Sequence, residues 1–257
     1  MDWYHTIELA PGVETAGWFD LRKVAARLPW PDLSGRRCLD VGTFDGFWAF
    51  EMERRGAAEV VAIDLLEPES WDWPAGSTEA VAEALNRRKH GGSGFETARK
   101  ALGSSVARHE LSVYDLDPER LGRFDFIYLG SLLLHLRDPV GALEHVRAAC
   151  SGELMLLDAF DPWLTVVSRA PAAALDGLGR PWWWRPSLRT LGRFVESAGF
   201  ELLSGPRPLL MPRGRGQPRP APRPRLLSTH AGRTALVSSW IGDPHAFLLA
   251  RPDISAN

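Results

Sequence analysis

The sequence predicts an open, doubly wound α/β fold. Three observations support it: the apolar content, the alternation of short apolar runs with amphipathic segments, and a glycine-containing turn directly after an early strand. The chain has 257 residues, 45% of them hydrophobic, which is enough for a large core. Alternating strands and helices are typical of a sheet with helices on both faces.

The first strand–helix–strand unit lies between residues 38 and 64. Cys38–Val41 is a short apolar run, Trp48–Arg55 has helical spacing, and Glu59–Asp64 is a β-branched strand. Parallel strands joined by a helix cross over in the right-handed sense. The unit therefore predicts two parallel strands whose carboxyl ends lie at one edge of the sheet.

The later elements follow the same alternation. Helices are expected at 139–149, where Asp138-Pro139 is a typical helix start, and at 187–198. Further strands are expected at 111–114, 124–129, 154–157, 200–203, 235–240 and 246–250.

The domain organisation predicted from composition has one main unit. Residues 1–35 are expected to form an N-terminal cap or lid, and residues 36–257 the main domain, with an insertion at 66–94. Residues 205–233 are expected to form a Pro/Arg-rich loop, since seven Pro and six Arg lie between 205 and 225. This loop is interpreted as a solvated linker, with an arm that closes on an acidic substrate or on RNA as the alternative.

Charge, cysteines and hydropathy exclude several classes of protein. The 30 basic and 32 acidic side chains give a formal charge of −2, so nucleic-acid binding is not expected by default, although it stays open. The two cysteines form no metal-binding or disulfide pattern, and no metal is expected. We expect a cytoplasmic protein that does not bind membranes, because a membrane span and a signal peptide are not evident.

The turn after the first strand carries the most information about a ligand. Gly42 and Gly46 flank it, and Asp64 would end the next strand, where a carboxylate can accept both hydroxyls of a ribose. A dinucleotide needs small residues and no negative charge beside its pyrophosphate, yet Phe44 and Asp45 lie here. A cationic nucleoside without phosphate, S-adenosylmethionine, is favoured over a dinucleotide and over a turn that binds no ligand.

These residues resemble a known family. The run Asp40-Val41-Gly42-x-x-Asp45-Gly46-Phe47, the strand-ending Asp64, and the segments 124–131 and 134–139 are similar to class I S-adenosylmethionine-dependent methyltransferases. Within that superfamily they are most similar to the branch of the wobble-uridine carboxymethyltransferases of tRNA. The resemblance covers roughly residues 36–160 and is specific for fold and cofactor, not for the substrate. It implies a seven-stranded, mostly parallel, Rossmann-like sheet.

The resemblance implies roles for individual residues. Asp40 and Gly42 would hold the methionine ammonium, and Asp64 the ribose. The residues expected to bind the cofactor are Asp40, Gly42, Thr43, Asp45, Gly46, Asp64, Leu65, Val113, Tyr114, Leu129, Gly130 and Ser131. Phe44 replaces the family's usual glycine, which leaves the path of the loop open.

Two residues are candidates for a general base. His135 follows the strand at 124–129 and titrates near neutral pH, as proton removal requires; capping or packing is its structural alternative. Asp158 ends the next strand and is the second candidate, with a hydrogen-bonding role as its alternative. Trp182-Trp183-Trp184 suggests at least one indole facing a pocket, with core packing as the other interpretation.

The function predicted from these features is methyl transfer from S-adenosylmethionine to a hydroxyl or amine of a small molecule, plausible for secondary metabolism. The short segment before the first strand favours a small acceptor, since the tRNA-modifying relatives have a larger basic extension. The alternatives are an RNA base methyltransferase that uses the Arg-rich loop, and a cofactor-binding module without turnover.

Overall fold

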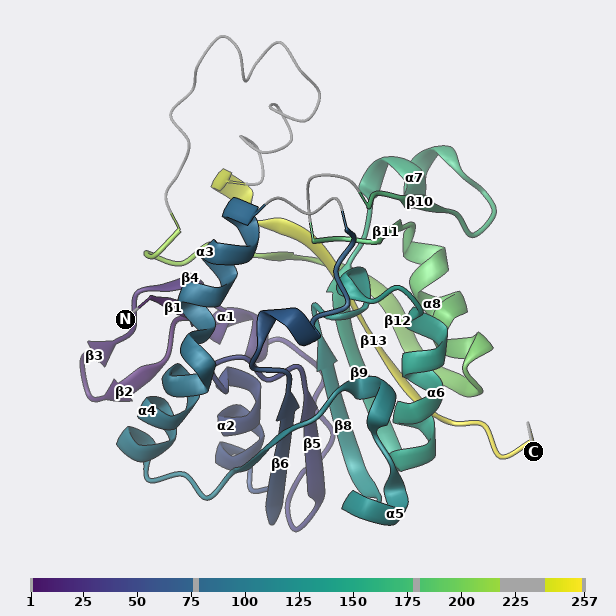
Figure 1. Ribbon diagram of the computed structural model, residues 1–257. Coiled ribbons are helices and arrows are strands. Elements are labelled where there is room, and N and C mark those ends of the chain that lie inside the picture. The colour runs from purple at the N-terminus through teal and green to yellow at the C-terminus, as the bar shows by residue number, and fades with distance from the viewer. Residues whose placement is uncertain (1, 76–78, 178–180, 218–238, 256–257) are drawn as a thin grey trace, which may run out of the picture.

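A computed structural model describes residues 2–75, 79–177, 181–217 and 239–255 (Figure 1). Its centre is a seven-stranded sheet with the order β12-β13-β9-β8-β5-β6-β7. The strand β13 is antiparallel to both of its neighbours, and the other pairs from β9 to β7 are parallel. The strands are β5 (Arg37–Val41), β6 (Glu59–Asp64), β7 (Ala107–Glu110), β8 (Phe124–Gly130), β9 (Cys150–Ala159), β12 (Phe200–Met211) and β13 (Asp243–Pro252).

Helices cover both faces of this sheet, and the strands alternate between the two cores. Along β5, Cys38 packs in the core that contains α2 and α4, whereas Leu39 and Val41 pack with α6 and α8. The helices are α2 (Phe47–Arg54), α3 (Glu79–Lys89), α4 (Ser93–Leu102), α5 (Pro118–Leu121), α6 (Pro139–Ala149), α7 (Pro162–Val167) and α8 (Leu188–Ser197). The predicted doubly wound fold is therefore confirmed.

The N-terminal residues form small strands at the edge of the cleft described below. The strands β1 (Trp3–His5) and β4 (Gly17–Phe19) pair in parallel, β2 (Glu8–Ala10) and β3 (Val13–Glu14) form a hairpin, and α1 (Arg22–Ala25) follows. Gly17 is required here, since a Cβ would lie 2.1 Å from the carbonyl carbon of His5. An isolated bridge from Phe19 to Arg213 joins these residues to the end of β12.

Short elements connect the large ones. Three 3-10 turns lie at the carboxyl edge: η1 (Pro68–Ser70), η3 (Val113–Asp115) and η4 (Leu133–His135). A fourth, η2 (His90–Gly92), joins α3 to α4, and β10 (Ala173–Leu175) pairs with β11 (Trp184–Pro186).

Three predicted elements are wrong. The strand expected at 111–114 lies earlier, at β7, because Ser112 accepts a hydrogen bond from the amide of Tyr114 and starts η3 instead. The expected loop does not begin at 205, since β12 continues to Met211. Its prolines are tolerated because β12 is the outermost strand, where a missing N–H donor costs no pairing.

The third correction concerns the expected strand 235–240. Residues 239–241 form a helical turn, and residues 235–238 lie outside the described part of the chain. Most of the Pro/Arg-rich segment, residues 218–238, also lies outside it.

Candidate active site

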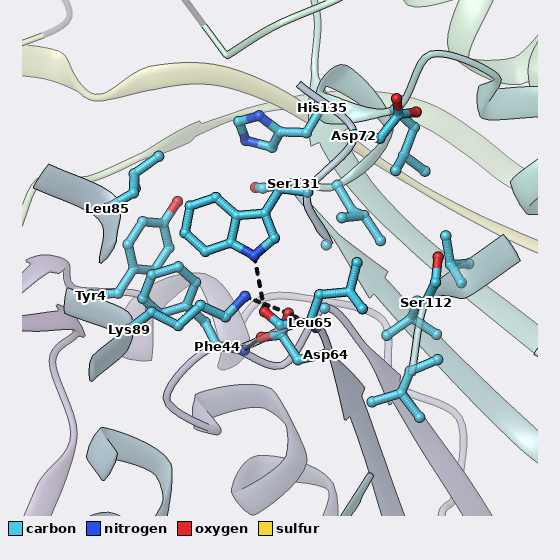
Figure 2. Close-up of a pocket in the computed structure, with 18 of the residues that line it drawn as sticks. Tyr4, Phe44, Asp64, Leu65, Asp72, Leu85, Lys89, Ser112, Ser131 and His135 are labelled. Atoms are coloured by element: carbon cyan, nitrogen blue, oxygen red, sulfur yellow. Dashed lines mark hydrogen bonds and ion pairs between the residues drawn. The ribbon is translucent and has the colours of Figure 1, made fainter. Parts of the chain in front are cut away.

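A cleft opens at the carboxyl edge of the sheet, where β5, β6 and β8 end. It holds about 1190 Å³ of space, part of it open to solvent. Its lining mixes aromatic side chains with a few charged ones, several of which Figure 2 shows turned toward the same space. The lining residues are Tyr4, His5, Leu21, Val41, Gly42, Phe44, Trp48, Ile63, Asp64, Leu65, Ser70, Trp71, Asp72, Trp73, Leu85, Lys89, Leu111, Ser112, Val113, Tyr114, Gly130, Ser131, Leu132, His135, Leu136, Leu157 and Met211.

The loop after β5 forms one wall of this cleft. Gly42 has a φ of 78°, in the left-handed region that favours glycine. Phe44, at the position where a glycine was expected, also has a positive φ of 55°. Its conformation is held by a hydrogen bond of 2.7 Å from its amide to Asp64 Oδ2 and by stacking on Tyr4, with ring centroids 4.3 Å apart. These contacts define the loop path that the sequence left open.

Asp64 lies at the end of β6, where the sequence placed it, and is almost fully buried. Besides Phe44, it accepts a hydrogen bond of 2.8 Å at Oδ1 from the amide of Leu65. The same Oδ1 accepts one of 2.5 Å from Nζ of Lys89, which comes from the end of α3 (Figure 2). The predicted ribose ligand is therefore part of a buried ion pair that the sequence did not reveal.

Asp40 lies beneath the cleft, on β5, and only 1% of its surface is exposed. Its Oδ2 and the neighbouring Thr43 Oγ1 are buried and make no hydrogen bond of normal geometry, although the two side chains interact. Burial disfavours the carboxylate and raises the pKa of Asp40 to about 7. A cation placed above this loop would supply the positive counter-charge that the carboxylate lacks.

Asp45 faces the N-terminal segment instead of the cleft. Its Oδ2 accepts hydrogen bonds from the amides of Tyr4 and His5, at 3.0 and 2.8 Å, and its Oδ1 pairs with Nδ1 of His5. These contacts fix β1 against the loop and bring Tyr4 to the cleft. Gly46 is packed against Phe50, which a Cβ would approach to 2.4 Å.

The end of β8 supplies the opposite wall. Gly130 and Ser131 line the cleft, whereas Leu129 lies inside the core. Ser131 has a φ of 50°, and its Oγ lies 3.2 Å from Nε2 of His245 on β13. Because Nδ1 of His245 donates to the carbonyl of Asp243, its Nε2 is left as the acceptor for the Ser131 hydroxyl.

His135 lines the cleft from η4 and is held in one orientation. Its Nδ1 donates a hydrogen bond of 2.5 Å to the carbonyl of Pro181, so Nε2 is the free acceptor. Burial disfavours the imidazolium and lowers the pKa of His135 to about 4. The imidazole is therefore neutral at physiological pH and can accept a proton at Nε2, as a weak base.

Asp158, the second candidate base, does not line the cleft. Its Oδ2 accepts hydrogen bonds from the amides of Leu132 and Leu133, at 2.9 and 2.8 Å, and its Oδ1 accepts one from Ala159. Burial raises the pKa of Asp158 to about 6. The carboxylate holds the turn that carries His135, and it is not placed to touch a substrate.

The inserted segment after β6 forms the roof. Trp71 and Trp73 line the cleft, with ring centroids 4.6 Å apart, and Trp71 Nε1 donates to the carbonyl of Leu65. Trp183 braces this roof from outside, since its Nε1 donates a hydrogen bond of 2.6 Å to the carbonyl of Asp72. The aromatic pocket expected from residues 182–184 is thus built mainly by other residues.

The structure brings together eight of the fourteen predicted site residues. Those on the cleft are Gly42, Asp64, Leu65, Val113, Tyr114, Gly130, Ser131 and His135. Those behind it are Asp40, Thr43, Asp45, Gly46, Leu129 and Asp158. Sequence reasoning missed Lys89, Trp71 and Trp73, although the aromatic richness of the insertion was visible.

Two further classes of site were searched for in the described part of the chain. Within it, no cluster of three or more His, Cys, Asp or Glu side chains is arranged to hold a metal ion. Among the helices described, none is both long and apolar enough to cross a bilayer.

The sheet order and the cleft beside the Gly42 loop define a class I S-adenosylmethionine-dependent methyltransferase fold. Residues 17–204 match the family model of the methyltransferase domain. The chain belongs to this family, and S-adenosylmethionine is its cofactor.

Curated relatives show two kinds of acceptor. A tRNA U34 carboxymethyltransferase of Campylobacter hominis is 25% identical over 189 residues, which are 72% of this chain and 57% of the relative. A ubiquinone biosynthesis O-methyltransferase of Xanthomonas oryzae pv. oryzae is 34% identical over 152 residues, 58% of this chain and 49% of the relative. The chain thus spans about half the length of these relatives, and neither acceptor carries over by itself.

A solved structure with the same fold is the 1,6-didemethyltoxoflavin-N1-methyltransferase of Burkholderia thailandensis, with bound 1,6-didemethyltoxoflavin and S-adenosylhomocysteine. It has a TM-score of 0.55 and 16% identity, and the match covers 91% of this chain and 78% of that one. This likeness supports the fold.

Proposed function

We propose that this chain transfers a methyl group from S-adenosylmethionine to a hydroxyl or amine of a small molecule. The observation that carries the proposal is the buried carboxylate oxygen of Asp40 without a hydrogen bond of normal geometry, beneath a cleft lined by aromatic rings. A buried carboxylate needs a hydrogen-bond donor or a cation as its partner, and the ammonium group of S-adenosylmethionine can be that partner. Aromatic faces such as Phe44 and Trp71 attract a sulfonium.

Asp64, Leu65 and Val113 fit the nucleoside end of the donor. Asp64 would accept the ribose hydroxyls, while Leu65 and Val113, from neighbouring strand ends, would contact the adenine. Gly42, Gly130 and Ser131 would lie along the methionine part. The start of α2 does not suit a phosphate, because Asp45 precedes it and places a carboxylate there. That carboxylate is bound by His5 and by the amide of Tyr4.

The bound donor supplies an electrophilic methyl group, so the protein's main task is alignment and exclusion of water. Alignment alone can contribute roughly 7–11 kcal/mol to lowering the barrier. Tyr4, Trp71 and Trp73 line the cleft and, with both substrates bound, would help to keep water out. His135 can take the proton of a hydroxyl acceptor at Nε2, which would add roughly 10²-fold, the lower end for a weak base.

A small acceptor is favoured over RNA by the cleft itself. Tyr4 and Trp71 line the cleft, and a nucleotide inside a folded RNA would have to pass these aromatic side chains to enter it. Among the lining residues that the structure describes, Lys89 is the single Lys or Arg, which leaves little positive charge there for a phosphate backbone. The RNA-modifying relatives make a test with RNA necessary.

The donor site is tested by binding of S-adenosylhomocysteine in calorimetry. Asp64→Ala is expected to weaken binding about 10- to 100-fold, the loss of one or two charge-assisted hydrogen bonds. Asp115→Ala, an exposed acid outside the cleft lining, is the matched control and is expected to bind normally. Unchanged affinity in Asp64→Ala would remove this residue from the ribose site.

The acceptor class is tested with isotopically labelled donor. The protein is incubated with a lysate separated into small molecules and RNA, and the label is expected in the small-molecule fraction. Label in RNA would refute the acceptor assignment, and label in neither fraction despite donor binding would indicate a module without turnover.

A further inference from the structure

Lys89 is a buried cation in the middle of the proposed donor site. Its side chain is 6% exposed and pairs with Asp64, itself 9% exposed. Its Nζ lies 5.1 Å from the ring centroid of Phe44 and 4.9 Å from that of Trp71. Leu85, one helical turn earlier on α3, also lines the cleft, so this face of the helix is part of the site (Figure 2).

The hydrogen bonds of Asp64 leave too little room for both a ribose and Lys89. A carboxylate has about four acceptor positions. The amides of Phe44 and Leu65 and the ammonium of Lys89 occupy three of them. The two hydroxyls of a ribose need two positions, and one is left. Donor binding through Asp64 therefore requires Lys89 to leave.

A released Lys89 needs another anion. A largely buried ammonium without a counter-charge is strongly disfavoured, and cation–π contacts recover only part of that cost. Among the lining residues that the structure describes, the other acid is Asp72. Its Oδ2 already accepts from Tyr114 Oη and from the amide of Arg137, and its Oδ1 lies 3.5 Å from the Arg137 guanidinium. Asp40, beneath the cleft, is assigned above to the donor's ammonium, and Asp72 is already paired, so the partner is expected to come with a ligand.

We propose that Lys89 leaves Asp64 when the donor binds and pairs instead with an anionic group, a carboxylate or a phosphate, on the methyl acceptor. The inference rests on the proposed function and adds the charge of its substrate. Phe44 and Trp71, on either side of the ammonium, suit an acceptor whose anionic group is attached to an aromatic ring. Donor and acceptor then bind with positive coupling. The donor releases Lys89 from Asp64, and the anionic group of the acceptor pairs with the released Lys89.

The first measurement separates an acceptor anion from the donor's own carboxylate. S-Adenosylhomocysteine is titrated into wild type, Lys89→Met and the control Lys100→Met, which changes an exposed lysine of α4. Lys89→Met is expected to bind it at least as tightly as wild type, because the competing ion pair is gone. A loss of about tenfold or more in Lys89→Met alone would make Lys89 a donor ligand and overturn the proposal.

The second measurement compares the binding of two anions, benzoate and phenyl phosphate, with that of benzamide, their uncharged control. In wild type saturated with S-adenosylhomocysteine, at least one anion is expected to bind about tenfold more tightly than benzamide, the effect of one charge-assisted hydrogen bond. This preference is expected to disappear in Lys89→Met and to remain in Lys100→Met.

Three results would overturn the inference. The first is equal binding of the anions and benzamide to wild type, which needs no variant to fold. The second is anion binding that is equally strong without S-adenosylhomocysteine. The third is a preference that survives in Lys89→Met. If S-adenosylhomocysteine binds to no form of the protein, the donor assignment itself fails, which is a distinct outcome.

Discussion

Replacing Asp40 with asparagine should change how stability depends on pH, because Asp40 holds a proton when folded. Burial raises its pKa from 3.8 to about 7. Between these values the folded protein keeps the proton and the unfolded chain has lost it. The unfolding free energy of wild type therefore falls as the pH rises from about 4 to about 7 and is unaffected by Asp40 above that.

The size of the effect follows from the interval. Each pH unit contributes about 1.4 kcal/mol, so the roughly three units between the two pKa values of Asp40 correspond to at most about 4 kcal/mol. Asparagine has the same shape and no proton to lose. The stability of Asp40→Asn minus that of wild type should increase with pH and level off above about pH 7.

The assay is urea unfolding of both proteins, followed by tryptophan fluorescence, at closely spaced pH values. Taking the difference cancels the contributions of Asp158, His135 and His245, whose pKa values are also shifted by burial. Saturating S-adenosylhomocysteine should flatten the wild-type dependence, because its ammonium favours the ionised carboxylate. Parallel curves for the two proteins without ligand would refute the reasoning, since Asp40 would then titrate alike in both states.

Two further changes test how the cleft is built. Asp45→Ala should cost about 3–5 kcal/mol of local stability, because it leaves His5 and two amides without their carboxylate. Faster hydrogen exchange confined to residues 2–19 would show this loss, with the exposed Asp32→Ala as control. Unchanged exchange in Asp45→Ala would contradict it. His135→Ala should lower kcat by roughly 10²-fold while donor affinity is kept. Wild-type turnover should show no inflection from His135 above about pH 5, since the pKa of His135 is about 4. A fall in donor affinity alone would make His135 a packing residue.

The sequence predicted those features that depend on neighbours along the chain. The β-branched run 59–64 reads as a strand ending in Asp64, and the structure has that strand with the same bounds. Helix α6 begins at Pro139 after the cap Asp138, whose side chain accepts the amide of Gly141. In both cases the signal and its effect lie within one turn or strand.

Features that depend on distant partners were not predictable in the same way. Asp45 was expected to face the cofactor, but its carboxylate accepts hydrogen bonds from the amides of residues 41 and 40 positions earlier. Asp158 similarly lies at the end of a strand, and its carboxylate accepts hydrogen bonds from the amides of the turn at Leu132 and Leu133. Which N–H groups reach an acidic side chain is decided by the packing of whole elements.

Lys89 shows what signal was present but not used. The chain has 30 basic residues, and Lys89 is one of only three lysines among them. In a chain that uses arginine so widely, a lysine in an aromatic-rich insertion indicates a place that suits a compact ammonium. Its pairing with Asp64 nevertheless required the position of α3 over the cleft.

The prolines of β12 have a consequence for the solution behaviour of the protein. In the described part of the chain β12 is the outermost strand of the sheet, and the outer side of such a strand could recruit a strand from another molecule. Pro206 and Pro208 have no N–H to offer, and Arg207 between them adds positive charge. The composition that resembles a linker thus protects the edge of the sheet against association, and replacing both prolines with threonine would be expected to promote aggregation.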